Sequence, residues 1–210
     1  VGPSGSGKST LLLHLNGVLA GEEGRVIIGN TEVSGKNLPE VRKLVGLVFQ
    51  NPDDQLFNPT VEEDIAFGPL NFGLPADEVR ARVMEALSML NLTGFEKLIS
   101  HHLSLGERKR VALATVLAMK PDILAFDEPF SNLAPSMVLQ LMEIMASMES
   151  TQVIVSQSVL PVIAHCKRMA ILNEGEIVAI DEPRKLAKKR DLMKASGLDL
   201  SLYRKICPDL

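Results

Sequence analysis

The hydrophobic positions of this chain fall into short blocks separated by polar, glycine-rich or proline-containing segments. Six of these blocks are short and rich in β-branched residues, and they predict strands at 25–29, 45–50, 123–126, 153–156, 169–172 and 177–180. Longer amphipathic stretches predict helices, one starting near residue 8 and others at 77–90, 107–119 and 136–148. This alternation predicts an α/β fold, with a mainly parallel sheet and helices on both faces.

The middle of the chain interrupts this alternation. Residues 51–106 carry helical patterns but no convincing strand. We interpret them as a helical subdomain inserted into an α/β core made of residues 1–50 and 107–210. Thr60 and Glu63 have the spacing of a capping box, which predicts that a helix starts near the beginning of this insert.

Residues 2–10 have the sequence Gly-Pro-Ser-Gly-Ser-Gly-Lys-Ser-Thr, which fits the phosphate-binding P-loop pattern at every fixed position. The glycines let the backbone curl so that its N–H groups face phosphate oxygens. Lys8 would bring a positive charge to the phosphates, while Ser9 would bind Mg²⁺ and Thr10 would bind a phosphate. An ordinary glycine-rich turn is disfavoured by the Lys-Ser-Thr ending. The predicted nucleotide-binding residues are Gly2, Pro3, Ser4, Gly5, Ser6, Gly7, Lys8, Ser9 and Thr10.

Only Val1 precedes this loop. A P-loop joins a strand to a helix, and that strand is normally central and buried. We therefore expect the sequence to be a fragment of a longer protein, or a chain whose N-terminal strands were not retained.

A second group of polar residues follows an apolar strand. The segment 123–128 has the sequence Ile-Leu-Ala-Phe-Asp-Glu, the Walker B pattern. Ligands of open α/β sheets bind at the carboxyl ends of strands, so Asp127 is expected to hold Mg²⁺. Glu128 is expected to orient or deprotonate an attacking water molecule. Gln50 ends another predicted strand and could bridge Mg²⁺ or that water, although a surface glutamine is the simpler interpretation.

The segment 103–107, Leu-Ser-Leu-Gly-Glu, precedes the predicted helix 107–119. The Ser104 hydroxyl, the Gly106 N–H and the helix N-terminus together could bind an anion. Alternatively, Ser104 could simply cap the helix. Two anion sites in one chain, separated by a helical lobe, indicate a dimer. Each nucleotide would lie between the P-loop of one subunit and this segment of the other.

Composition limits the other functions. The formal net charge of −4 argues against general nucleic-acid binding, and no apolar run approaches the ~20 residues of a membrane span. Cys166 and Cys207 are far apart and are expected to be reduced thiols of a cytosolic protein. His101 and His102 have no third ligand at a zinc-like spacing, so we assign them no metal site.

Together these motifs resemble the ATP-binding cassette ATPases over essentially the whole chain. In that family, Gln50 corresponds to the Q-loop glutamine and 103–107 to the signature motif. Residues 131–135 correspond to the D-loop, and Gln157 stands where the family has its switch histidine. The segments 50–57 and 60–69 are similar to the ATPase subunits of energy-coupling-factor importers, especially the cobalt/nickel branch.

The resemblance implies an ATPase that uses ATP and Mg²⁺ and drives import of a small ligand, with cobalt and nickel ions as candidates. The implied partners are a second ATPase subunit, identical or different, and integral membrane transport subunits that dock beside residues 51–72. The implied location is the cytoplasmic face of the cell membrane, as a peripheral protein. The implied catalytic residues are Glu128, Gln50 and Gln157, the Mg²⁺ ligands are Ser9, Gln50 and Asp127, and the residues that contact the γ-phosphate in the other subunit are Ser104 and Gly106.

The chain departs from the family pattern at three positions. Leu105 stands where a glycine is usual, Ala134 where an acid is usual, and Gln157 where the switch histidine is usual. A glutamine amide can donate a hydrogen bond, but it cannot carry a positive charge or shuttle a proton. These departures motivate an alternative function, a nucleotide-binding regulatory subunit with weak hydrolysis, which the intact Glu128 opposes.

A third function is an ATPase that acts on DNA or on protein assemblies. DNA-repair relatives carry long coiled coils between the P-loop and the signature motif. Here only about a hundred residues intervene, without sustained heptads, which disfavours this function.

Overall fold

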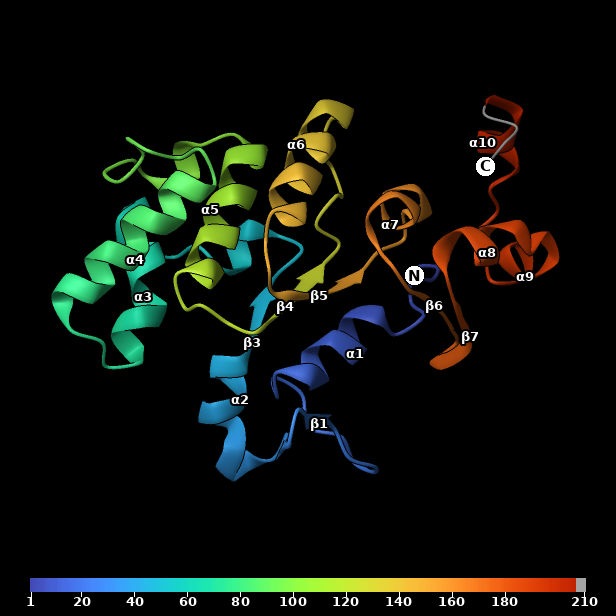
Figure 1. Cartoon of the computed structure of the whole chain (residues 1–210), viewed down its shortest axis with the longest axis horizontal. Coiled ribbons are helices and arrows are strands. Elements are labelled where there is room, and N and C mark those ends of the chain that lie inside the picture. Colours follow the sequence, from blue (N-terminus) through green and yellow to red (C-terminus); the bar gives the residue numbers. More distant parts are fainter. Residues whose placement is uncertain (207–210) are drawn as a thin grey trace.

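A three-stranded parallel sheet lies at the centre of the protein. The computed structural model describes residues 1–206 (Figure 1). The sheet contains β3 (Val45–Val48), β4 (Ile123–Asp127) and β5 (Thr151–Val155), in the order β3-β4-β5. Both strand pairs are parallel, which confirms the predicted α/β fold with a parallel sheet.

The two faces of this sheet bury alternate residues of each strand. On one face, Leu12 of α1 (Lys8–Leu15) packs in a cluster with Leu47 and Ala125. On the other, Leu124 and Phe126 belong to the core that contains α5 (Leu105–Leu117) and α6 (Pro135–Ala146). Figure 1 shows α1 on one side of the strands and α5 and α6 on the other. Because side chains alternate along a strand, Asp127 follows Ala125 on the α1 face.

The remaining strands form two antiparallel hairpins. One joins β1 (Ile27–Ile28) to β2 (Thr31–Glu32), and the other joins β6 (Met169–Asn173) to β7 (Glu176–Asp181). The β6–β7 turn has a positive φ at Glu174 (49°) and at Gly175 (83°), as tight hairpin turns require. The strand predicted at 25–29 is thus reduced to two residues, and the last two predicted strands run antiparallel.

Val1 lies alongside β6. Its amino group donates to the Ala170 carbonyl at 2.7 Å, and its own carbonyl accepts from the Leu172 N–H at 2.8 Å. These two bonds follow the parallel pattern, so the residue that leads into residues 2–10 is held by β6.

Residues 51–106 contain only helices and loops, all of them within the described part of the chain. The helices are α3 (Val61–Asn71), α4 (Ala76–Met89) and the short 3₁₀ helices Pro52–Asp54 and Ser100–His102. The predicted capping box at the start of α3 is present, with both hydrogen bonds between Thr60 and Glu63.

The helix α5 (Leu105–Leu117) begins two residues before its predicted start at 107. Residues of α3, α4 and α5 share one hydrophobic core with β3 and β4. Packing is thus continuous across the proposed boundaries. The division into a core and an inserted helical subdomain stays a prediction.

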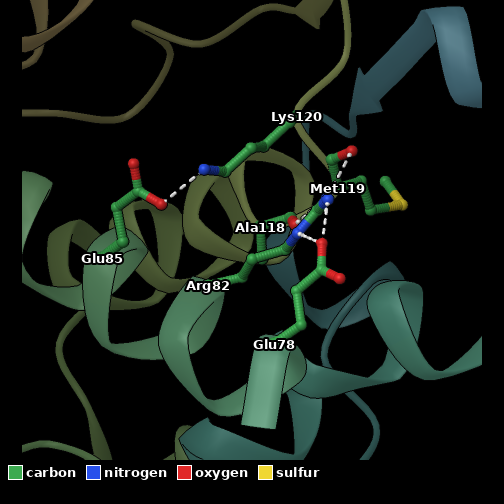
Figure 2. Close-up of polar contacts among 6 residues, drawn as sticks. All are labelled: Glu78, Arg82, Glu85, Ala118, Met119 and Lys120. Carbon is green, nitrogen blue, oxygen red and sulfur yellow. Dashed lines mark hydrogen bonds and ion pairs between the residues drawn. The ribbon is translucent and has the colours of Figure 1, made fainter. Parts of the chain in front are cut away.

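The end of α5 is tied to α4 by a polar cluster (Figure 2). The Arg82 guanidinium bonds to the Glu78 carboxylate at 2.7 Å and donates to the carbonyls of Ala118 and Met119, both at 3.4 Å. Next to it, Lys120 pairs with Glu85 at 2.7 Å. A cation near the last carbonyls of a helix satisfies unpaired acceptors and opposes the negative end of the helix dipole. This cluster fixes where α5 ends relative to α4.

The other helices surround these elements. They are α2 (Leu38–Leu44), α6 (Pro135–Ala146), α7 (Val159–His165), α8 (Pro183–Lys188), α9 (Arg190–Ala195) and α10 (Ser201–Ile206). A separate hydrophobic cluster joins β6 to α7, α8 and α9. Within residues 1–206, no helix has the length and apolar character needed to cross a membrane. Cys166 follows α7, and Cys207 lies outside the described residues.

Candidate functional site

The P-loop has the geometry of a phosphate cradle. Gly5 and Gly7 have φ angles of 76° and 96°, and α1 starts directly afterwards at Lys8. The Lys8 ammonium donates to the Pro3 carbonyl at 2.8 Å and so folds across the loop. The Ser6 hydroxyl is buried and has no hydrogen-bond partner within residues 1–206. An unpaired buried hydroxyl is costly, so a ligand oxygen at this loop would satisfy it.

Gly2 holds the start of the loop against β6. A Cβ atom at this position would lie 2.1 Å from the carbonyl oxygen of Leu172 and 2.6 Å from the Ser6 hydroxyl. Because the first of these atoms belongs to the backbone, only glycine fits here without moving the loop.

The structure brings together two of the predicted Mg²⁺ ligands. The Ser9 hydroxyl of α1 donates to the Asp127 carboxylate at the end of β4, at 3.0 Å. A hydroxyl and a carboxylate supply the oxygen ligands that Mg²⁺ prefers, with water completing its shell. Together with the free Ser6 hydroxyl, they fit a Mg²⁺ ion bound beside nucleotide phosphates.

The third predicted ligand, Gln50, is not joined to this pair. It lies two residues beyond the end of β3, at the same edge of the parallel sheet as Asp127. Its side chain is exposed and makes no hydrogen bond within the described residues. Its predicted role in binding Mg²⁺ or water stays a prediction.

Glu128 has a strained backbone and a buried side chain. Its φ angle is +46°, a left-handed conformation that costs a non-glycine residue about 1 kcal/mol or more. Its carboxylate accepts a hydrogen bond from the Gln157 N–H at 2.8 Å. Burial raises the pKa of the Glu128 carboxyl, while the Gln157 N–H and the charge of Lys8 oppose that rise. A carboxylate with a raised pKa is a better proton acceptor near neutral pH.

At the switch position, the backbone of Gln157 rather than its side chain contacts Glu128. The bond to Glu128 comes from the main-chain N–H of Gln157, and the Gln157 residue is exposed. Gln157 also lines a groove of 820 Å³ together with Phe130 and Leu133. The predicted role of its amide in contact with phosphate stays a prediction.

The signature segment starts α5. Ser104 is the N-cap residue and forms a capping box with Glu107, whose carboxylate accepts from the Ser104 hydroxyl at 2.6 Å. These hydrogen bonds lower the pKa of Glu107. The simpler interpretation of Ser104, a helix cap, is therefore present. Because α5 and α1 cover opposite faces of the sheet, Ser104 and Gly106 do not complete the P-loop of their own chain.

Two further residues join the parts of this site, and sequence reasoning gave them no role. The Gln55 amide accepts from the Phe49 N–H at 3.1 Å and donates to the Ala112 carbonyl of α5 at 2.6 Å. Lys109 reaches from α5 to the segment that follows β4. Lys109 was detectable, since it lies three residues after Gly106 and four before Leu113, on the buried face of the helix.

Comparisons with known proteins agree with this geometry. The family model described as ABC transporter matches residues 1–131. The energy-coupling factor transporter ATP-binding protein EcfA of Methanothermobacter thermautotrophicus is 46% identical over 205 residues, which cover 95% of this chain and 66% of that protein. EcfA of Methanococcus maripaludis is 42% identical over 205 residues, covering 95% and 74%.

Solved structures give the same result. CbiO1 of Clostridium perfringens, described as part of the ABC transporter complex CbiONQ, has a TM-score of 0.83 and 33% identity, covering 99% of this chain and 85% of that one. A dimeric post-hydrolysis structure of the ATP-binding cassette MJ0796, with ADP and phosphate bound, has a TM-score of 0.76 and 29% identity, covering 87% and 83%.

A P-loop that opens a helix beside a parallel strand ending in Asp-Glu defines a P-loop nucleoside triphosphatase. With the matches above, the chain belongs to the ABC transporter family of ATPases. Its relatives include proteins named as energy-coupling factor ATP-binding subunits.

Proposed function

We propose that this chain is the ATP-hydrolysing subunit of a membrane importer for a small ligand. The observation that carries the proposal is the meeting of Ser9 and Asp127 at the P-loop, with the buried Glu128 carboxylate as the next residue along the chain. The candidate cargo, cobalt or nickel ions, rests on the resemblance of segments 50–57 and 60–69 to that branch of importers.

The residues of the site have separate tasks in this reaction. The P-loop N–H groups and Lys8 bind the phosphates of ATP, and Ser9 and Asp127 hold Mg²⁺. Mg²⁺, when bound, neutralises charge on the β- and γ-phosphates. Glu128 accepts a proton from the attacking water, whose oxygen bonds to the γ-phosphorus while the bond from that phosphorus to the bridging oxygen breaks. The products are inorganic phosphate and ADP, which keeps the bridging oxygen.

A second ATPase subunit would complete the site. Ser104 and Gly106 start α5 on the sheet face opposite α1, so their proposed contacts with a γ-phosphate require another chain. The dimeric form of the structurally similar cassette MJ0796 supports this arrangement. Either a homodimer or a heterodimer satisfies the geometry.

The membrane subunits would dock at a groove of 480 Å³ beside α3. Two of its phenylalanines, Phe57 and Phe67, are 62% and 47% exposed and lie edge to face at 4.9 Å. Exposed aromatic pairs mark surfaces that bind partners. The description of CbiO1 as part of a transporter complex supports partner subunits for this chain. The proposed docking surface beside residues 51–72, and the proposed location at the cytoplasmic face of the membrane, rest on the family resemblance.

A regulatory subunit with weak hydrolysis is the second candidate. It is favoured by Ala134, which has no carboxylate at a D-loop position where the family usually carries an acid and so cannot make that polar contact across a dimer. It is also favoured by Gln157, which has no ionisable group at the switch position.

Turnover of Mg-ATP by the full-length protein and its Gln157→His variant separates these candidates. For the hydrolytic subunit, we expect clear turnover and a change of less than about tenfold in the variant, because the contact with Glu128 comes from the backbone of residue 157. A silent parent that gains about 10²-fold in the variant would instead favour the regulatory subunit. A silent parent that the variant does not rescue would contradict hydrolysis altogether.

A further inference from the structure

Lys109 is a buried cation at the junction of α5 and the segment after β4. It is 8% exposed. Its ammonium lies 2.9 Å from the Ser131 carbonyl, 3.1 Å from the Pro129 carbonyl and 3.4 Å from the Glu128 carbonyl. The Ser131 hydroxyl is a fourth neighbour at 3.2 Å. All of these oxygens belong to residues 128–131, so one ammonium binds a single short turn.

The backbone is left-handed at the first residue of that turn and at the residue that follows it. Glu128 has a φ angle of +46° and Asn132 one of +58°, although neither is glycine. The Glu128 carbonyl also accepts from the Ser131 N–H at 3.1 Å and from the Ser131 hydroxyl at 2.8 Å. Strained conformations persist only where the surrounding structure holds them. Here the Glu128 carbonyl is held by Ser131 and Lys109, and the Glu128 N–H donates to the Val155 carbonyl at 3.0 Å.

The charge of Lys109 is costly where it lies. Among the described residues, none of its hydrogen-bond acceptors is a carboxylate. Burial lowers the pKa of Lys109 to about 8, and the negative charge of Glu128 only partly opposes this. An apolar side chain would fill the buried face of α5 at lower cost. The hydrogen bonds to residues 128–131 therefore explain better than packing why a lysine occupies this buried position.

A second contact joins the same two segments. Gly106, one turn before Lys109, packs so closely against α6 that a Cβ atom would lie 1.9 Å from the Met137 methyl group. Met137 lies in the first turn of α6, directly after the D-loop residues 131–135. The first turns of α5 thus contact both ends of the segment from Glu128 to α6.

We propose that Lys109 is a positioning residue that holds the Glu128 backbone for ATP hydrolysis and ties it to the signature helix. The proposal rests on the proposed function. In a dimer, Ser104 and Gly106 would contact one nucleotide while Glu128 of the same chain acts on the other. A shift of the first turn of α5 would then reach Glu128 through Lys109, so the two sites would be coupled.

The test compares ATP hydrolysis by the full-length protein with that of Lys109→Met and Lys109→Gln. Misplacement of a reacting group by about 1 Å lowers the reaction rate by up to about 10²-fold. We therefore expect Lys109→Met to lower kcat at least about tenfold. The KM for ATP should stay within about twofold, because the P-loop is untouched. Lys109→Gln should recover at least about a third of kcat, because its amide still donates to the carbonyls. Because a partly unfolded preparation would also lower the apparent kcat at an unchanged KM, kcat is expressed per ATP-binding subunit, measured by equilibrium binding on the same preparation.

Arg110→Met is the matched control. Arg110 lies on the same helix and also donates to backbone carbonyls, those of Leu90 at 3.1 Å and Asn91 at 3.5 Å, but away from Glu128. Its removal should leave kcat within about twofold. A Lys109→Met protein that is folded and turns over ATP like the parent would overturn the proposal.

If Lys109→Met does not fold, Ser131→Ala replaces it, since it removes the hydroxyl that bonds both Lys109 and the Glu128 carbonyl. We expect kcat to fall at least about threefold at unchanged KM, and an unchanged kcat would overturn the proposal. A parent that does not hydrolyse ATP would count against the proposed function instead, independently of either variant.

Discussion

Replacing Glu128 with glutamine is expected to lower kcat for ATP about 10²–10⁴-fold while ATP binding stays close to that of the parent. Glutamine keeps the size of the side chain and can still accept the hydrogen bond from the Gln157 N–H. It cannot accept a proton from water, so the loss falls on the chemical step. Turnover and equilibrium binding of ATP, measured on the same preparations, give kcat and the ATP affinity of parent and variant.

The pH dependence of kcat provides a second test of Glu128 as the proton acceptor. Burial holds the pKa of Glu128 above its ordinary value, so the proton-accepting carboxylate is lost as the pH falls through that raised value. The parent should lose activity on the acid side at a higher pH than an ordinary carboxylate would produce. Glu128→Gln should lack this limb in its residual activity.

Glu149→Gln is the matched control, because it neutralises an exposed glutamate outside the site. Its turnover should equal that of the parent. Parent-like turnover by Glu128→Gln would exclude Glu128 as the proton acceptor.

Replacing Gly2 with alanine is expected to weaken ATP binding by at least about tenfold. The new Cβ atom would lie 2.1 Å from the Leu172 carbonyl oxygen, which β6 holds in place. The P-loop would have to move away from β6, and its N–H groups would no longer converge on the phosphates. Such overpacking costs about 1–3 kcal/mol, so a lower melting temperature should accompany the loss of binding.

Gly35→Ala is the control for this prediction. Within the described residues, nothing lies within 4 Å of a Cβ atom there, and no positive φ angle is required. Both affinity and melting temperature should match the parent. If Gly2→Ala bound ATP as the parent does, the close packing of the P-loop on β6 would not matter for nucleotide binding.

The sequence predicted those parts of the site that follow from recognisable motifs. The P-loop pattern and an apolar strand ending in Asp-Glu assigned Ser9 and Asp127 to one Mg²⁺ site, and their side chains are hydrogen-bonded in the structure. Their role as Mg²⁺ ligands stays a prediction. The helix caps at Thr60 and Ser104 likewise depend only on residues three positions apart.

The sequence did not predict features set by contacts between distant segments. The left-handed backbone of Glu128 is held partly by distant groups, the Lys109 ammonium and the Val155 carbonyl, which no local pattern shows. Lys109 lies in the run Glu-Arg-Lys-Arg, which is typical of a solvated surface, although its helical phase is that of a buried residue. The antiparallel direction of β7 was set by a tight turn at 174–175 rather than by the hydrophobic pattern.

The bond between the backbone N–H of residue 157 and the Glu128 carboxylate has a consequence for sequence variation. Nineteen of the common amino acids carry an N–H group on the main chain, and only proline does not. The side chain at 157 is therefore free to differ among related proteins without the loss of this contact. Proline is the one residue that the geometry excludes at that position.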